Sequence, residues 1–155
     1  MTPEHELDPE ALGDHFDRLY RAAWALCGSR EDAEDLVQDT YARVLARPRV
    51  VRRDDDLGYL LRVLRNTFVS SRRTAARRPQ AAPGAEPAAA AEVREVYRAI
   101  SELSDDFRDA LVAIDVAGLS YTEAARALKV AEGTITSRLF RARRQVAETL
   151  APPLD

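Results

Sequence analysis

The chain has 155 residues, of which 46% are hydrophobic and 32% are charged, and its formal net charge at pH 7 is −3. This length allows one domain or two small ones, no stretch approaches the roughly 18 apolar residues of a membrane span, and the single cysteine, Cys27, excludes an internal disulfide bond. The acidic N-terminal segment also lacks the apolar run of a secretory signal. We therefore expect a cytoplasmic protein without membrane insertion.

The first half of the chain predicts three helices. Apolar residues recur at helical spacing over three segments, about 9–27, 30–47 and 56–77. Asp8 is suited to cap the first helix and Gly28 to end it. Ser29 is suited to cap the second, which stops at Pro48. Residues 48–56 are predicted to form a polar connection.

The second half begins after a change in composition. Alanine and proline dominate residues 75–91, which is typical of a linker. Two more helices are predicted beyond it, at about 93–103 and 105–117. No strand alternation is visible. The expected fold is all-α, with two small helical domains at 8–78 and 92–151 joined by a flexible Ala/Pro-rich linker at 79–91.

Residues 119–150 predict a helix, a tight turn and a second, arginine-bearing helix. Ser120 and Glu123 have the spacing of a capping box, so the first helix should begin there. The turn falls around Lys129 to Gly133, and the second helix should run from about Thr134. Two short helices joined in this way form a helix-turn-helix, whose second helix enters the DNA major groove.

Charge is sorted along the chain. Residues 1–40 carry eleven acids and three bases, whereas residues 41–80 carry eleven bases and three acids. Residues 81–120 are acidic again, and residues 121–155 are weakly basic. Basic segments suit phosphate contacts, while acidic segments repel DNA and suit a basic protein partner. Charged side chains that merely solvate helix surfaces would explain the amount of charge, but not its separation into alternating acidic and basic segments.

Two helices carry most of this charge. In the acidic helix, Asp32, Asp35 and Asp39 lie roughly on one side, an arrangement that a solvated helix explains equally well. In the basic helix, arginines share the polar surface with Asn66 and Ser70, and Tyr59 lies near its start. This mixture suits contacts to a nucleic-acid backbone together with stacking on an exposed base.

The sequence lacks the motifs and spacings by which catalytic and metal-binding residues are usually recognised. Its two histidines and one cysteine have no zinc-site spacing, and no phosphate-binding loop or hydrolase motif is present. The acids of residues 31–39 lack the glycine-containing loop of an EF-hand. We expect a protein that is not an enzyme and that has no metal site and no cofactor.

Three blocks, in this order, resemble bacterial extracytoplasmic-function (ECF, group IV) RNA polymerase sigma factors of the sigma-70 family. REDAEDLVQDTYARVL resembles the region 2 helix that binds the clamp helices of RNA polymerase. LGYLLRVLRNTFVSSRR resembles the helix that reads and melts the promoter −10 element. LSDDFRDALVAIDVAGLSYTEAARALKVAEGTITSRLFRARRQVAETL resembles region 4, which reads the −35 element.

The resemblance implies a function and assigns roles to residues. It implies a subunit that binds core RNA polymerase, through the clamp helices of the largest subunit and the flap of the second, directs initiation at promoter DNA, and is controlled by an anti-sigma factor. The implied polymerase-binding residues are Asp32, Asp35, Gln38 and Asp39. The implied −10 residues are Tyr59, Arg62, Arg65, Asn66 and Arg73. The implied −35 residues are Glu132, Thr134, Thr136, Ser137, Arg138 and Arg141.

The chain departs from the family pattern at three of its residues. Tyr59 stands near a position where tryptophan is usual. Lys129 stands where glycine is common, because a left-handed backbone suits glycine, and Ala131 stands where proline is frequent.

Two other functions remain open at this point. A stand-alone helix-turn-helix regulator would explain residues 119–150 but not the acidic helix. The other is a sigma-like helical adaptor that does not bind DNA, which loss of function on Asp35→Arg together with a harmless Arg138→Ala would indicate.

Overall fold

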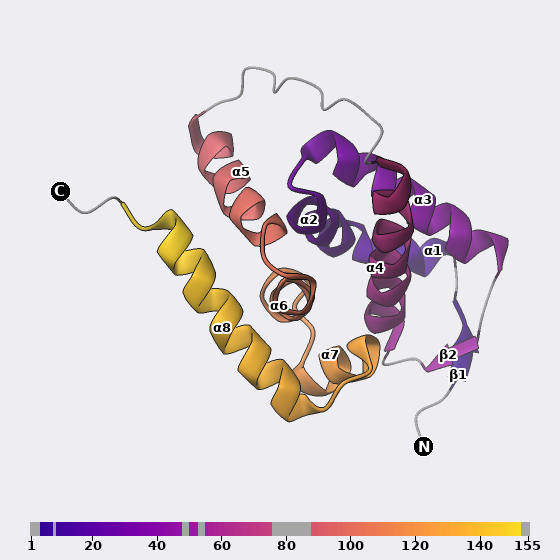
Figure 1. Cartoon of the computed structure of the whole chain (residues 1–155). Helices are drawn as coiled ribbons and strands as arrows, with labels where there is room; N and C mark the ends of the chain where they lie inside the picture. Colours follow the sequence, from indigo (N-terminus) through magenta and orange to yellow (C-terminus); the bar gives the residue numbers. More distant parts are fainter. Residues whose placement is uncertain (1–3, 8, 48–49, 53–54, 76–87, 153–155) are drawn as a thin grey trace.

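The computed structural model describes residues 4–7, 9–47, 50–52, 55–75 and 88–152, and over these the fold is all-α apart from one small ribbon (Figure 1). None of the helices in these ranges is long and apolar enough to cross a membrane. The elements in chain order are β1 (Glu4–Glu6), α1 (Pro9–Leu12), η1 (Gly13–His15), α2 (Phe16–Cys27), α3 (Arg30–Ala46), β2 (Val50–Arg52), α4 (Asp56–Ala75), α5 (Ala88–Ser101), α6 (Asp105–Leu111), η3 (Val112–Val116), α7 (Tyr121–Leu128) and α8 (Glu132–Leu150).

The ribbon contradicts the expectation of no strands. β1 and β2 pair antiparallel, with Glu4 opposite Arg52 and Glu6 opposite Val50. Each strand has only three residues, so a period of two cannot be recognised in either segment. The ribbon ties the N-terminal segment to the 48–56 connection, which the sequence predicts as an irregular loop.

The helices of the first half match the prediction closely. The first predicted helix is interrupted by the short 3₁₀ turn η1, so that α1 and α2 replace one continuous helix. Gly28 ends α2 with φ 74°, a left-handed backbone that glycine adopts without strain. The Ser29 side chain caps α3 by accepting from the N–H of Asp32. Asp8, the predicted first cap, lies outside the described residues.

The helix-turn-helix is confirmed, with one shifted boundary. The capping box forms in both directions, with the Glu123 N–H donating to Ser120 Oγ at 3.1 Å and the Ser120 N–H donating to Glu123 Oε1 at 3.0 Å. Lys129 follows α7 with φ 57° and is the only non-glycine residue with positive φ in the described part of the chain. The second helix, α8, begins at Glu132 rather than near Thr134.

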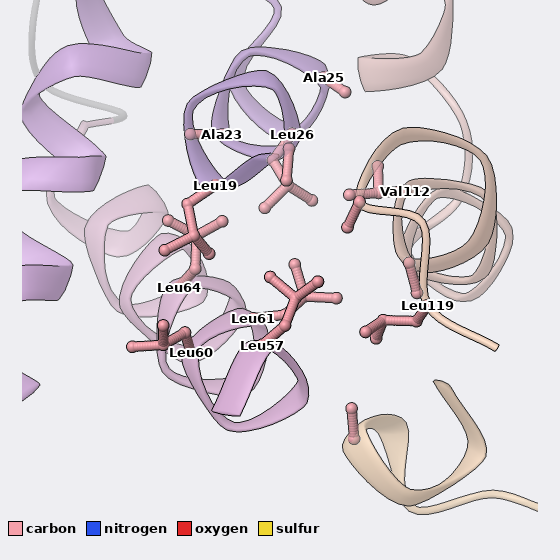
Figure 2. Close-up of a cluster of buried hydrophobic side chains, with 14 of the residues drawn as sticks. Leu19, Ala23, Ala25, Leu26, Leu57, Leu60, Leu61, Leu64, Val112 and Leu119 are labelled. Atoms are coloured by element: carbon pink, nitrogen blue, oxygen red, sulfur yellow. The ribbon is translucent and has the colours of Figure 1, made fainter. Parts of the chain in front are cut away.

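The two helical groups, α1–α4 and α5–α8, pack directly against each other. Figure 2 shows leucines of α2 and α4 converging with Val112 and Leu119 from the second group, and all of them belong to one buried cluster. The ring centroids of Trp24 on α2 and Tyr97 on α5 lie 4.8 Å apart across the boundary between the two groups. A Cβ on Gly28 would lie 2.5 Å from Ser101 Oγ, so glycine permits the close approach of α2 to α5. Most of the predicted linker lies outside the described residues, and α5 begins within it at Ala88.

Candidate nucleic-acid interface

The basic helix α4 has one apolar side and one arginine-bearing side. Its leucines, among them Leu60 and Leu64, are fully buried against α2. The opposite side meets the second helical group. There Arg62 donates to two main-chain carbonyls in the last turn of α7, from Nη2 to Arg126 O at 3.1 Å and from Nε to Ala127 O at 3.3 Å. The carboxyl end of a helix carries partial negative charge and therefore favours a guanidinium group.

Two further arginines of α4 meet carboxylates of α6. Arg65 Nε lies 3.0 Å from Asp109 Oδ2, and Arg72 Nη1 lies 2.9 Å from Asp105 Oδ1. The hydrogen bond from Arg72, with the charge of Arg108 nearby, holds the pKa of Asp105 below its usual value. Two arginines of the basic side of α4 are thus paired with carboxylates within the chain.

Arg108 forms the buried centre of this contact. Its side chain is only 2% exposed and lies 3.0 Å from Asp105 Oδ1 and 3.3 Å from Asp109 Oδ1. Its guanidinium carbon lies 4.9 Å from the centre of the Phe68 ring on α4, which is a cation–π distance. A buried guanidinium is stable only when it is paired, so Arg108 and its two aspartates form one unit.

The remaining −10 candidates of α4 differ in accessibility. Asn66 is exposed, and its Oδ1 accepts from Arg65 Nη1 at 3.4 Å. Tyr59 is half-buried against the core. Arg73 lies within α4, but its side chain is outside the described part of the structure. The sequence predicts Arg62 and Arg65 on the polar surface of α4; both lie on that side and are half-buried, because it faces the second helical group.

The acidic helix α3 presents its carboxylates to solvent. Asp32, Asp35, Gln38 and Asp39 are all exposed, while Leu36 and other apolar residues of α3 are buried. Within the described ranges, no group of three or more histidine, cysteine, aspartate or glutamate side chains has the geometry to hold a metal ion. The helix therefore offers an open acidic surface of a kind suited to a basic partner.

The recognition helix α8 presents most of its candidates outward. Glu132, Thr136, Ser137 and Arg141 are exposed, and Thr134 is half-buried. Glu132 Oε1 accepts from the Thr122 hydroxyl at 2.6 Å, which links α8 to α7. Arg138 is drawn towards α6, with Nη2 3.6 Å from Asp106 Oδ2 and its side chain 28% exposed.

Several residues of these surfaces do not stand out in the sequence. Phe140 is 69% exposed, one turn beyond Thr136, on the outward side of α8. The only sequence signal for it is an aromatic residue set among arginines. The aspartates of α6 give a weaker signal, because acids in the first turn of a helix are explained by its dipole alone.

Both halves of the chain match known families. Residues 12–78 match sigma-70 region 2, and residues 93–146 match sigma-70 region 4. The ECF RNA polymerase sigma factor SigE of Mycolicibacterium smegmatis is 35% identical over 156 residues, which cover 92% of this chain and 61% of that protein. The ECF RNA polymerase sigma factor EcfG of Rhodopseudomonas palustris is 35% identical over 138 residues, which cover 83% of this chain and 76% of that protein.

A solved structure agrees with the sequence matches. The sigma factor RpoE of Bartonella quintana, crystallised with the anti-sigma factor NepR, superimposes with a TM-score of 0.74 at 30% identity, covering 91% of this chain and 94% of RpoE. Fold, region order and sequence identity agree along nearly the whole chain. The protein therefore belongs to the ECF sigma factors of the sigma-70 family.

Proposed function

We propose that this protein binds core RNA polymerase and directs it to promoters that carry particular −10 and −35 elements. The observation that carries this proposal is the presence of an exposed acidic helix, a basic helix and a helix-turn-helix on one chain, in the order of sigma regions 2 and 4. We assign residues 8–78 to region 2, 79–91 to the linker and 92–151 to region 4.

Polymerase binding is assigned to α3. Asp32, Asp35, Gln38 and Asp39 form its exposed polar surface, and the partners would be the clamp helices of the largest polymerase subunit. Region 4 would contact the flap of the second subunit. Exposed charges of one sign steer association and select the partner more than they add affinity. An acidic surface of this kind has no use in a protein that binds only DNA.

Reading of the −10 element is assigned to α4. Asn66 is exposed on this helix and Tyr59 lies near its start, where they would meet an unpaired base, while Arg62, Arg65 and Arg73 would hold backbone phosphates. Flipping a base costs a few kcal/mol, which contacts in a protein pocket can offset. Promoter opening then requires binding energy alone, so we propose that the chain is not an enzyme and needs no cofactor.

Reading of the −35 element is assigned to the first turns of α8. Arginine can pair with guanine in the major groove, and serine, threonine and glutamate can bond other base edges. The residues proposed for this role are Glu132, Thr134, Thr136, Ser137, Arg138 and Arg141.

Control is assigned to a separate protein. The Bartonella relative was crystallised with an anti-sigma factor, and we propose that this chain likewise acts in the cytoplasm under an anti-sigma factor. Affinity capture from the native host should recover such a partner besides polymerase subunits. Recovery of polymerase subunits alone would contradict this part of the proposal.

Reconstitution with bacterial core polymerase tests the function. We expect the purified chain to form a holoenzyme and to initiate from promoters selected out of random DNA. Asp35→Arg should abolish holoenzyme formation, whereas Glu95→Arg, the same charge reversal on the exposed surface of α5, should leave it intact. Failure to bind core polymerase and to initiate from any selected promoter would overturn the proposal. Tight operator binding by a dimer without polymerase would instead indicate a stand-alone regulator.

A further inference from the structure

The first turn of the recognition helix is tied to α7 by a short side-chain hydrogen bond. Thr122, the second residue of α7, donates from its hydroxyl to Oε1 of Glu132, the first residue of α8, at 2.6 Å. A hydroxyl bond to a carboxylate is charge-assisted and has a normal length of about 2.5–2.7 Å. The contact therefore has the geometry of a strong hydrogen bond, and Figure 1 shows α7 beside the start of α8.

This hydrogen bond lies at the protein surface. The side chains of Thr122 and Glu132 are both exposed. The two helices are joined by buried residues instead, among them Ala124 of α7 and Ile135 of α8, which belong to one apolar cluster. The bond is therefore better suited to fix the position of a surface carboxylate than to hold the helices together.

The second oxygen of the Glu132 carboxylate remains available. Thr122 is the one side-chain partner that this carboxylate has among the residues that the structure describes. The Thr136 hydroxyl, one turn further along α8, donates to the main-chain oxygen of Glu132 at 3.1 Å and so is already engaged. Oε2 can therefore accept a hydrogen bond from a group outside the protein, while Oε1 is held.

We propose that Thr122 is a positioning residue for Glu132, and that the carboxylate held in this way selects a cytosine at one position of the −35 element. This inference rests on the proposed function, because it needs α8 to lie in the major groove. The N-terminal residues of a recognition helix reach base edges there, and Glu132 is the first residue of α8.

Cytosine is the base whose major-groove edge suits a carboxylate. It presents the N4 amino group as a donor, whereas guanine presents acceptors and thymine presents an acceptor and a methyl group. Adenine has an amino donor, but its N7 acceptor lies beside that donor. Because a carboxylate repels an acceptor, Glu132 discriminates by excluding the other bases as well as by binding cytosine.

The hydrogen bond from Thr122 strengthens this discrimination. Glutamate has a long side chain that loses much conformational freedom when it is fixed. Without the bond, the Glu132 carboxylate would also be free to turn away from an unfavourable base. The bond orders the side chain before DNA binds, and such preorganisation reduces the entropic cost of making the contact.

Selection of −35 sequences by the reconstituted holoenzyme tests the role of Glu132. Glu132→Ala should lower the preference for cytosine at one position by at least about fivefold, the effect of one lost base contact. Glu132→Gln should shift the preference at that position towards adenine, since an amide pairs with N6 and N7 of adenine. The other positions of the element should keep their preferences.

Substitutions of Thr122 isolate its positioning role. Thr122→Val removes the hydroxyl from a side chain of similar shape and should lower the same cytosine preference by about threefold, the usual effect of one hydrogen bond. Thr122→Ser retains the hydroxyl and should retain the preference. Thr149→Val makes the same replacement at an exposed position in the last turn of α8 and, as the matched control, should change no preference.

A double substitution separates positioning from a structural role. In a Glu132→Ala background, Thr122→Val should have no further effect on base preference, because no carboxylate remains to be positioned. A bond that only stabilised the fold would instead give Thr122→Val a lower urea midpoint and an unchanged base preference, and this result would overturn the inference.

Two other results would also overturn it. The absence of a cytosine preference that depends on Glu132 would show that the carboxylate does not read this base. Equal weakening of Thr122→Val on all promoter sequences would show that the hydroxyl contacts a phosphate, which carries no sequence information. Failure of the proposed function is distinct from these results, since the native chain would then form no holoenzyme or initiate from no promoter.

Discussion

Arg65 on α4 and Asp109 on α6 form an ion pair of 3.0 Å, although 44 residues separate them in the chain. The Asp109 side chain is buried and that of Arg65 is half-buried. A residue that region 2 would use on the −10 element is thus held by region 4. The interaction can be tested only in the full chain, since neither region alone contains both partners.

Truncation of Arg138 should weaken reading of the −35 element. We expect Arg138→Ala to reduce discrimination at one position of the selected −35 sequence by about 1–3 kcal/mol, the usual effect of one lost base contact. Competition between holoenzymes on promoter variants measures this. Arg98→Ala, which removes an exposed arginine from α5, is the control and should leave the preference unchanged. An unaltered preference in the Arg138 variant would refute the assignment.

Replacement of Lys129 by glycine should stabilise the chain. Lys129 has φ 57°, a left-handed conformation that strains a residue with a Cβ. We expect Lys129→Gly to raise the free energy of unfolding by about 1 kcal/mol, measured from urea denaturation. Lys129→Ala keeps the Cβ and should bring no comparable gain. Equal effects of the two substitutions would show that the backbone of this turn is not strained.

Loss of the capping box should destabilise the helix-turn-helix. Ser120→Ala removes the acceptor of the Glu123 N–H, and a lost serine cap typically lowers stability by about 1 kcal/mol. Ser104 stands at the same position of α6 but makes no side-chain capping hydrogen bond. Ser104→Ala should therefore have a smaller effect on the urea midpoint. A larger effect at Ser104 would contradict the capping geometry.

A cavity beneath α4 should destabilise the shared core. Leu64 is fully buried, and a buried leucine replaced by alanine usually lowers stability by about 2–5 kcal/mol. Leu45 on α3 is 50% exposed, so Leu45→Ala should change stability by less than about 1 kcal/mol. Similar losses for the two variants in thermal or urea unfolding would show that Leu64 is not a core residue.

The thiol of Cys27 should resist modification. Burial, and secondarily the charge of Asp32, raises the pKa of Cys27 to about 12. At pH 8 only about one thiol in ten thousand is then ionised, against roughly a quarter in an unfolded chain with a pKa of about 8.5. We expect labelling by a disulfide reagent to be at least about 100-fold slower in the native chain than in urea.

The same shift has a consequence for stability. The folded-state pKa lies above the unfolded value, so the contribution of this thiol to stability is complete below about pH 8.5 and declines as pH rises towards 12. The labelling rate of the native chain should accordingly stay low through pH 9. A rise centred near pH 8.5 would show an accessible, ordinary thiol.

Local features of the fold were predictable from the sequence. Three kinds of feature depend on residues only a few positions apart, so the sequence shows them directly. They are the capping box of Ser120 and Glu123, the helix boundary at Gly28 and Ser29, and the amphipathic period of each helix. The left-handed conformation of Lys129 could also be expected from the sequence, because related sequences commonly have glycine at this position. The strands β1 and β2 were missed because their pairing joins segments more than forty residues apart, each too short to show a period.

The placement of charged residues was predictable only in part. Periodicity puts Arg62 and Arg65 on the polar side of α4, and that is where they lie. Whether such a side meets water or another helix depends on contacts such as that of Arg62 with the end of α7, which joins residues 65 positions apart. The burial of Arg108 could not be predicted for the same reason. In the sequence it stands among aspartates, a pattern that a solvent-exposed helix turn also shows.

The contacts of α6 with both α4 and α8 imply thermodynamic coupling between these two helices. Asp105 and Asp106 are consecutive in one helix, yet Asp105 pairs with Arg72 of α4 and Asp106 with Arg138 of α8, the helices to which we assign the −10 and −35 elements. A promoter element that binds Arg138 breaks its ion pair with Asp106 and so weakens the packing of α6, the helix that also pairs with Arg72. By thermodynamic reciprocity, an element that binds Arg72 weakens the ion pair between Asp106 and Arg138. We therefore expect a strong match at one promoter element to compensate for a weak match at the other, with the cooperativity residing in the polypeptide itself.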